Sequence, residues 1–445
     1  MLNNTKSFLK ENFYPILLFF VTLVISILNF KPGTFLIGFD SLHNEFDLAL
    51  NLKRTFFGVW QTHQGLGLLG GMSHLSDIPR MLILLILSVF LPVWSLRYIW
   101  TLSMFILGPI GVYFLALTLM GGERSSAKKS AAFLAGMFYI FNLSTVQLFF
   151  SNFDGFISHY GFIPWLFMFS YKFITQGQRK DIVLFIIFSI LGANQAYTGT
   201  LFFAFALSLS ILVFFVSIQN RKTVPFKRLL TFIALWFGVN AFWILPVGYF
   251  IKTSSGVVSK ASINLMSSEE SYFMNRKYGT IGDVLTLKNF WFDLNDYSRE
   301  TNDFVPLLEV WIDNINGKTI LLYASALMVI LGFFVSITTK KYRSISLLFL
   351  ISVFFLMAGN GLFGNLFLFL QRSVPLFKEA LRFPFTKFSV LASLMYSLMI
   401  FVLFEKIFDL IYSKTKKHLV VGGIVFFLSL IFMYTYKPYF KGYLL

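Results

Sequence analysis

Long apolar runs separated by short polar segments make up most of this chain. The first run extends from about 13 to 30, and a helix needs about 20 such residues to cross a bilayer. Further spans are expected near 98–119, 131–149, 157–175, 182–194, 200–218, 229–250, 319–337, 345–358, 386–404 and 419–434. The pattern therefore predicts an all-α, polytopic transmembrane bundle of about eleven spans.

Basic residues cluster in short segments between these runs and indicate the orientation of the bundle. Because such clusters stay on the cytoplasmic side, we expect the N-terminus to lie inside. The clusters contain Arg124, Arg179, Arg221, Lys340 and Lys414. Segments 31–97 and 251–318 are then both outside, as is the C-terminus, and the cell membrane is the expected location.

One apolar segment, 81–95, does not fit this alternation of sides. If it crossed the membrane, the basic cluster at Arg124 would lie outside. It is only about 15 residues long and ends near Pro92 and Trp94, so we expect it to lie in the outer interface. With no cleavage site after the first run, that run is expected to remain as a helix.

Three regions follow from this topology. A membrane module covers 1–250 and includes the first outer loop, 31–97. An acidic outer loop covers 251–318, and further transmembrane helices cover 319–445.

Composition agrees with a membrane protein and excludes several other classes. Hydrophobic residues make up 57% of the chain, the mean hydropathy is +0.73, and there are no cysteines. The net charge of +17 comes from clusters between apolar runs and not from one basic face, so no nucleic-acid partner is expected. The sequence has no P-loop and no dinucleotide fingerprint.

The start of the first outer loop concentrates ionisable residues just beyond the first helix. Asp40, His43 and Glu45 stand there at the expected depth of the membrane surface. A carboxylate in that position can act as a general base on a hydroxyl or hold a divalent cation. Alternatively, Asp40 caps an amphipathic helix at 41–58.

The rest of this loop adds aromatic and charged candidates for substrate binding. Trp60 and His63 adjoin a glycine-rich run whose backbone can approach a ligand closely. Asp77 and Arg80 follow, and an arginine is suited to bidentate phosphate contact. Arg80 could instead anchor the interfacial segment.

Later outer turns add further polar groups. Asp154 and His159 lie between two spans, and Asn194 and Gln195 interrupt another apolar stretch. Such groups usually line a cavity, although a hydrogen-bonded turn also explains them. Near 374–388, Arg382 and Lys387 place positive charge outside, where anionic lipid headgroups or a pyrophosphate would compensate it; a solvated turn is the alternative.

Four short motifs give the chain a resemblance to a known family. They are Pro32-Gly33 through Asp40, Trp60 with Gly65-Leu66-Gly67, Ser76-Asp77-Ile78-Pro79-Arg80, and Leu381-Arg382-Phe383-Pro384-Phe385-Thr386-Lys387-Phe388. With them, the chain resembles the polytopic GT-C glycosyltransferases. Among these it looks most like the membrane part of the bacterial α-(1→3)-arabinofuranosyltransferase family.

The resemblance implies a donor, a reaction and roles for residues. A polyprenyl-phosphate sugar would be the donor, and a cell-envelope glycan or lipid the acceptor, with inversion at the sugar carbon. Asp40 would be the base, assisted by Asp154 or Glu45. Asp40 and Asp154 would hold any divalent cation, Mg²⁺ or Mn²⁺. Arg80, Arg382 and Lys387 would face the phosphate.

Two other functions suit the same polar residues. A transporter or flippase for lipid-linked sugars needs a similar lining, but it predicts charges at mid-membrane depth and an internal repeat. A non-catalytic assembly partner in envelope biogenesis would keep the fold and lose the chemistry.

Overall fold

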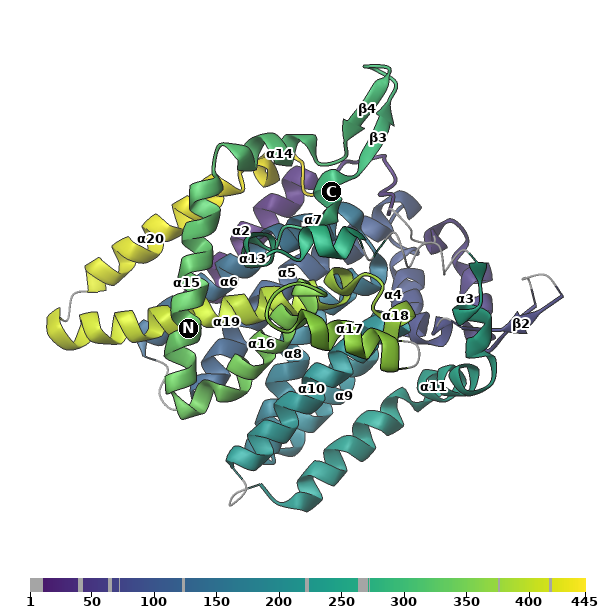
Figure 1. The fold of residues 1–445 in the computed structure, drawn as a ribbon, viewed down its shortest axis with the longest axis horizontal. Helices are drawn as coiled ribbons and strands as arrows, with labels where there is room; N and C mark the ends of the chain where they lie inside the picture. The colour runs from purple at the N-terminus through teal and green to yellow at the C-terminus, as the bar shows by residue number, and fades with distance from the viewer. Residues whose placement is uncertain are drawn as a thin grey trace.

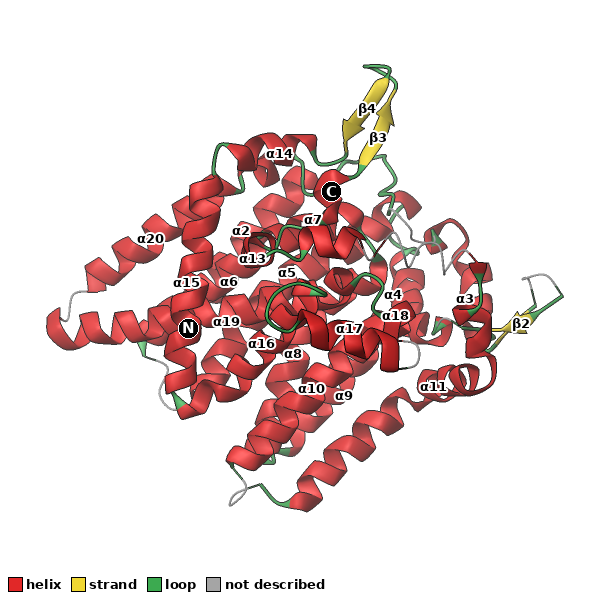
Figure 2. Cartoon of the chain, in the orientation of Figure 1, coloured by secondary structure: helices red, strands yellow, loops and turns green. Residues whose placement is uncertain are grey.

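The structure is a computed structural model, and it consists almost entirely of helices (Figures 1 and 2). It describes residues 11–38, 43–62, 66–71, 73–121, 125–220, 224–262, 271, 273–374, 377–415 and 418–445. The longer helices are α2 (Phe13–Asn29), α5 (Val93–Met120), α6 (Ser126–Ile140), α7 (Leu143–Ser151), α8 (Asp154–Gln176), α9 (Arg179–Leu191), α10 (Gly199–Gln219), α11 (Phe226–Ser259), α15 (Thr319–Thr338), α16 (Arg343–Met357), α19 (Pro384–Thr415) and α20 (His418–Thr435).

Shorter elements connect these helices. They are η1 (Asn44–Asp47), α3 (Leu48–Phe56), η2 (His74–Asp77), α4 (Ile78–Leu87), η3 (Ala193–Ala196), α13 (Ile281–Thr286), η4 (Phe290–Asp293), α14 (Glu309–Asn316), η5 (Lys340–Tyr342), α17 (Gly364–Ser373), α18 (Phe377–Ala380) and η6 (Lys437–Lys441). Two antiparallel hairpins contain the strands of the described chain, β1 (Trp60–Gln61) with β2 (Leu68–Leu69), and β3 (Asn295–Ser298) with β4 (Asp303–Pro306).

Several helices are long and apolar enough to cross a membrane, which is consistent with a multi-pass membrane protein. Within the described residues, α5, α10, α11, α15, α19 and α20 meet that description. The pair α6 and α7, bent by 46° at Phe141 and Asn142, brings the number from six to seven if it is one span. Each expected span overlaps a helix, and 131–149 overlaps two, α6 and α7. The count of about eleven crossings remains a prediction.

Helix α19 forms the centre of the bundle and is buried along its membrane-spanning part. It packs against α6, α15 and α16. A Cβ atom at Gly332 on α15 would lie only 2.1 Å from the Met399 carbonyl oxygen of α19. Small residues allow such close helix contacts, which supply packing where lipid gives no hydrophobic driving force.

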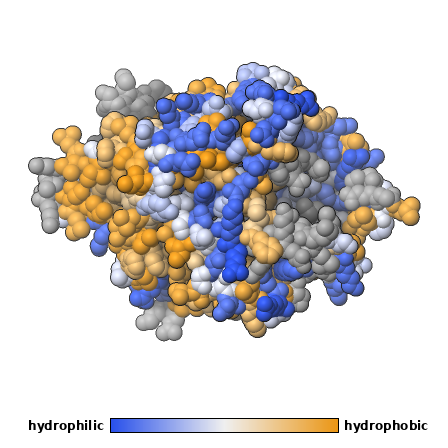
Figure 3. Space-filling view, turned by 45° about the horizontal axis from the view of Figure 1, so that its top comes forward, coloured by the Kyte–Doolittle hydropathy of each residue, from blue (hydrophilic) through white to orange (hydrophobic). Residues whose placement is uncertain are grey.

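Apolar side chains also cover much of the surface at the periphery of the bundle. Large exposed examples are Ile320 on α15 and Leu419 and Phe426 on α20. In Figure 3 hydrophobic colour covers much of the left side, and hydrophilic colour gathers toward the top. This distribution suits helices that face lipid along their sides.

The segment expected to lie in the interface is divided between two helices. Helix α4 ends at Leu87, and α5 begins at Val93 directly after its N-cap Pro92, which has no amide proton and disfavours a helix in the residue before it. The amphipathic helix expected at 41–58 is also shorter, because Asp47 caps α3 by accepting a hydrogen bond from the Leu50 amide over 2.9 Å. Asp40 lies outside the described residues.

Candidate functional site

A buried cluster of charged side chains gathers at one end of the bundle. Its acids are Glu45 on η1, Asp77 at the start of α4 and Asp154 at the start of α8. Arg80 on α4 and Arg97 on α5 lie between them. All five residues are buried, and we call this group the acid–arginine cluster.

Arg80 joins two of the acids. Its Nε and Nη2 donate to Asp77 Oδ1 and Oδ2 over 2.7 and 2.8 Å, a bidentate contact within one helical turn. Its Nη1 lies 3.2 Å from Asp154 Oδ2. Guanidinium and carboxylate planes match in this arrangement, which makes such contacts stronger than ordinary hydrogen bonds.

Arg97 holds the same Asp154 carboxylate from the other side. Its Nη2 donates to Asp154 Oδ2 over 2.7 Å and its Nε to Oδ1 over 3.3 Å. Its Nη1 lies 3.0 Å from His43 Nδ1 and 3.9 Å from Glu45 Oε1. Both oxygens of Asp154 therefore accept hydrogen bonds from arginine.

These contacts determine the charge state of the cluster. Burial raises the pKa of the Asp154 carboxyl, but the positive charges of Arg80 and Arg97 outweigh burial and bring that pKa below its ordinary value of 3.8. Burial lowers the pKa of Arg80, but Asp154, Asp77 and Glu45 together raise it above its ordinary value. Asp154 is thus ionised and Arg80 protonated at neutral pH.

His43 pairs with Glu45 at the edge of the acid–arginine cluster. His43 Nδ1 lies 3.2 Å from Glu45 Oε1, and the His43 side chain is 24% exposed, whereas that of Glu45 is 4% exposed. The same nitrogen faces an Arg97 donor, so its role depends on the tautomer.

Amide side chains complete the hydrogen bonding of Asp77. Asn44 Nδ2 donates to Asp77 Oδ2 over 3.2 Å, and Asn194 Nδ2 donates to Oδ1 over 2.5 Å. The Ser158 hydroxyl donates to the amide oxygen of Asn194, Oδ1, over 2.8 Å. Asn194, the polar residue that interrupts an apolar stretch in the sequence, therefore contacts the acid–arginine cluster through Asp77.

His159 and Gln195 lie next to these residues and pair with each other. His159 Nδ1 is 2.8 Å from Gln195 Oε1, and both side chains are buried. They follow Ser158 and Asn194 in sequence, and within the described residues neither forms an ion pair or hydrogen bond with the charged groups. Their observed role is to connect α8 to η3.

Local backbone preferences position two of the acids. Pro79 in the first turn of α4 suits a helix start and places Asp77 at the N-cap, one turn from Arg80. Asn152 ends α7 in the left-handed conformation, at φ 45°, which asparagine tolerates better than most residues. The chain then turns into α8, whose positive N-terminus favours Asp154.

Other predicted site residues lie apart or cannot be placed. Asp40 and His63 are outside the described residues. Trp60 is half exposed on the β1–β2 hairpin, and a Cβ atom at Gly67 would lie 2.7 Å from its Nε1, so the indole covers that glycine. Among the described residues, Trp60 forms no hydrogen bond with the acid–arginine cluster.

Arg382 and Lys387 lie on another segment that approaches the α7–α8 turn. Phe385 and Thr386 share a small cavity with Phe153 and Phe156, the neighbours of Asp154 in sequence. Lys387 Nζ donates to Thr386 Oγ1 over 2.9 Å, and in the described chain no carboxylate lies within 4.0 Å of it. A partly buried ammonium without an acidic neighbour favours an anion.

The described carboxylates do not fit a divalent cation well. Asp154 and Asp77 already accept hydrogen bonds from arginine and amide donors. In the part of the chain that the structure describes, no group of three or more His, Cys, Asp and Glu side chains has a geometry suited to a metal ion. We therefore assign no step to Mg²⁺ or Mn²⁺.

One residue of the cluster, Arg97, and one of its hydrogen-bonding partners, Asn44, were not predicted from sequence. Arg97 interrupts an apolar run as Leu96-Arg97-Tyr98, and an arginine within such a run is itself a signal because it is costly there. Asn44 carries no such signal, since a polar residue in a polar loop is ordinary.

The protein is helical and carries a buried charged site at one end of its bundle. Its long apolar helices are consistent with a multi-pass membrane protein. Comparison with known protein families, curated proteins and solved structures found no match to this chain.

Proposed function

We propose that the protein is an integral-membrane glycosyltransferase of the GT-C type. It moves a sugar from a polyprenyl-phosphate donor to a cell-envelope glycan or lipid on the outer face of the cell membrane. In this proposal the bundle has eleven crossings with the N-terminus inside. The observation that carries it is the convergence of three acids and two arginines from separate segments at one end of the bundle.

The proposed reaction is a single displacement. A base takes the proton of an acceptor hydroxyl, the acceptor oxygen bonds to the anomeric carbon, and the bond from that carbon to the phosphate oxygen breaks. The phosphate leaves with the electron pair, and the anomeric configuration inverts. Such a step needs a base near the hydroxyl and positive charge near the phosphate.

The base is assigned to Asp40 or Glu45. Asp154 is fully engaged by Arg80 and Arg97, so it serves as a positioning residue that fixes both arginines. Glu45 is less constrained, since it contacts His43 and lies 3.9 Å from Arg97. Asp40 precedes this pair by only a few residues in the sequence.

Positive charge for the leaving phosphate is assigned to Lys387, with Arg382 nearby in sequence. The absence of a described carboxylate beside Lys387 supports this assignment. Arg80 is assigned to the acids instead, because its guanidinium is buried and paired.

One observation favours a second function. Saturation of Asp154 by arginine is also what a purely structural cluster would show, as in a non-catalytic assembly partner for lipid-linked glycans. A transporter is favoured less, because the acids lie at helix ends and not in the middle of long helices.

The test is sugar transfer by purified protein in lipid nanodiscs from a panel of polyprenyl-phosphate sugars. Asp40→Asn and Glu45→Gln are compared with Asp47→Asn, a matched control in the same loop that keeps a capping side chain on α3. We expect Asp47→Asn to retain transfer and one of the other two to lose at least about a hundredfold, the typical share of a general base. Absence of transfer from every donor, with donor binding intact, would reject the enzyme.

A further inference from the structure

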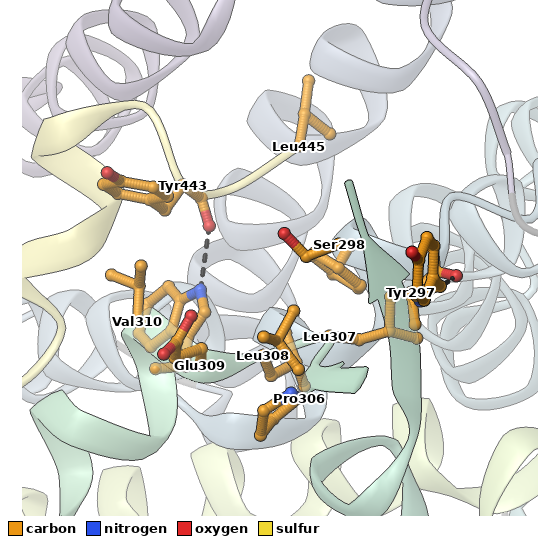
Figure 4. Close-up of a pocket in the computed structure, with 13 residues that line it drawn as sticks. Tyr297, Ser298, Pro306, Leu307, Leu308, Glu309, Val310, Tyr443 and Leu445 are labelled. Carbon is orange, nitrogen blue, oxygen red and sulfur yellow. Dashed lines mark hydrogen bonds between the residues drawn. The ribbon is translucent and has the colours of Figure 1, made fainter. Parts of the chain in front are cut away.

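A second site lies between the β3–β4 hairpin, the start of α14 and the C-terminal segment. It is a pocket of about 360 Å³. In Figure 4 Ser298 comes from the hairpin, Glu309 from α14 and Tyr443 from the C-terminal segment, and these three residues lie around one space. The volume is near the lower end for ligand pockets, which begin at about 300 Å³, so it suits one small unit of a ligand.

The chemistry of the lining suits an uncharged polyol. Ser298 adds a hydroxyl to the lining, whereas the Tyr297 ring lies on the other face of the strand and packs against Phe304. Asp296 and Glu309 offer carboxylate oxygens, which accept hydrogen bonds from hydroxyl groups. Since none of the described lining residues is basic, an anionic ligand would gain no compensating charge.

The lining of the pocket is connected to the rest of the fold through Trp311 and Tyr443. Trp311 is buried, and its Nε1 donates to the Tyr443 carbonyl oxygen over 2.9 Å (Figure 4). Its ring also packs on Tyr439, 5.0 Å between centroids, and the Tyr439 carbonyl accepts a hydrogen bond from Asn29 at the end of α2. Such anchoring holds a binding surface in place before a ligand arrives.

The pocket and the acid–arginine cluster share the α7–α8 turn. Phe150 lines the pocket and precedes Asp154 by four residues, a stretch that spans at most about 14 Å. The rings of Phe153 in this turn and Trp291, just before the hairpin, are 6.1 Å apart. A short oligosaccharide bound in the pocket therefore has the reach to place its next hydroxyl near the cluster.

We propose that this pocket is a binding subsite for an uncharged sugar unit of the acceptor glycan. The proposal of carbohydrate binding is argued from the residues that line the pocket, whereas the role as acceptor subsite rests on the proposed glycosyltransferase function.

The test is direct binding to purified full-length protein in nanodiscs, by calorimetry and saturation-transfer NMR. The probes are methyl glycosides of mannose, galactose and arabinofuranose with their disaccharides, glucose 1-phosphate as an anionic sugar, and trilysine as a basic peptide. We expect one neutral glycoside to bind and Glu309→Gln or Ser298→Ala to weaken it about tenfold, the effect of one lost hydrogen bond to a charged or polar group.

The matched control is Asp313→Asn, an exposed carboxylate on the same helix that does not line the pocket. It should leave binding unchanged. Asp296→Asn removes the charge of a hairpin carboxylate that lines the pocket and gives an independent readout if Glu309→Gln folds poorly. Binding of trilysine alone, or glycoside binding unaffected by all three pocket variants, would overturn the proposal.

Transfer assays separate this inference from the function on which it partly rests. If glycosides bind and the pocket variants weaken them but no donor supports transfer, the subsite stands and the enzyme fails. If transfer occurs and Glu309→Gln changes neither glycoside binding nor the KM for acceptor, the enzyme stands and the subsite fails.

Discussion

Replacing Arg97 by leucine tests whether the acid–arginine cluster is held together as the geometry indicates. The side chain is 2% exposed, and its loss removes the contacts of 2.7 and 3.3 Å to Asp154 and of 3.0 Å to His43. Hydrogen bonds to charged groups contribute about 1.5–3 kcal/mol each. Breaking a buried ion pair by removing one partner costs about 3–5 kcal/mol, and we expect Arg97→Leu to fall in that range.

The assay is equilibrium unfolding in mixed micelles, with Arg343→Leu as the control. Arg343 is exposed at the start of α16, so its replacement should change the free energy of unfolding by less than about 0.5 kcal/mol. Asp154→Leu and the double variant Arg97→Leu/Asp154→Leu complete a mutant cycle. Because the two side chains touch, the double variant should lose less than the sum of the single losses.

Two outcomes refute this reasoning. One is an Arg97→Leu protein no less stable than Arg343→Leu. The other is a pair of single losses that add up in the double variant, which would mean that the Arg97–Asp154 contact contributes nothing as a pair.

Three further predictions concern other parts of the molecule. The pKa of Asp154 is lower in the folded protein than its ordinary value of 3.8, so the ionised carboxylate stabilises the fold above pH 3.8. This contribution is lost as the pH falls below 3.8 and through the folded pKa. Acid unfolding curves of wild type and Asp154→Asn should therefore converge at low pH. Gly332→Ala should destabilise the α15–α19 contact by about 1–3 kcal/mol, whereas Gly238→Ala, with open space around its Cβ position, should not, as thermal unfolding will show. Lys387→Met should weaken binding of a polyprenyl-phosphate sugar about tenfold without lowering the stability of the ligand-free protein, whereas exposed Lys340→Met should change neither; unchanged donor binding in Lys387→Met removes that residue from the phosphate site.

Hydropathy predicts the helices of this protein well because each long apolar run must satisfy its own backbone hydrogen bonds as a helix. Spans expected at 200–218 and 319–337 coincide closely with α10 and α15. Hydropathy predicts the ends of helices less well than their existence. The segment 81–95 contains Pro92, and the start of α5 just after this proline follows from local backbone preference and not from hydropathy.

The candidate site was predictable in its acids and not in its pairing. Glu45, Asp77 and Asp154 stand out as carboxylates beside apolar runs. Their convergence depends on how α4, α5 and α8 pack, which no local pattern contains. Arg80 illustrates the limit, because the same spacing from Asp77 suits an interfacial anchor, a phosphate ligand or the buried ion pair that the structure has.

The stability of the cluster and its function can be separated, because a buried ion pair is seldom the most stable way to fill a space. Well-packed apolar residues of similar size often replace such a pair without loss of stability. A chain that keeps two arginines and three acids at a buried helix end therefore needs them for something other than stability, or for a specific packing arrangement. The Arg97→Leu/Asp154→Leu variant distinguishes these two explanations. If it recovers most of the stability lost in the single variants but transfers no sugar, the cluster is required for chemistry. If it recovers stability and retains transfer, the charges specify packing alone, and the base must act without them.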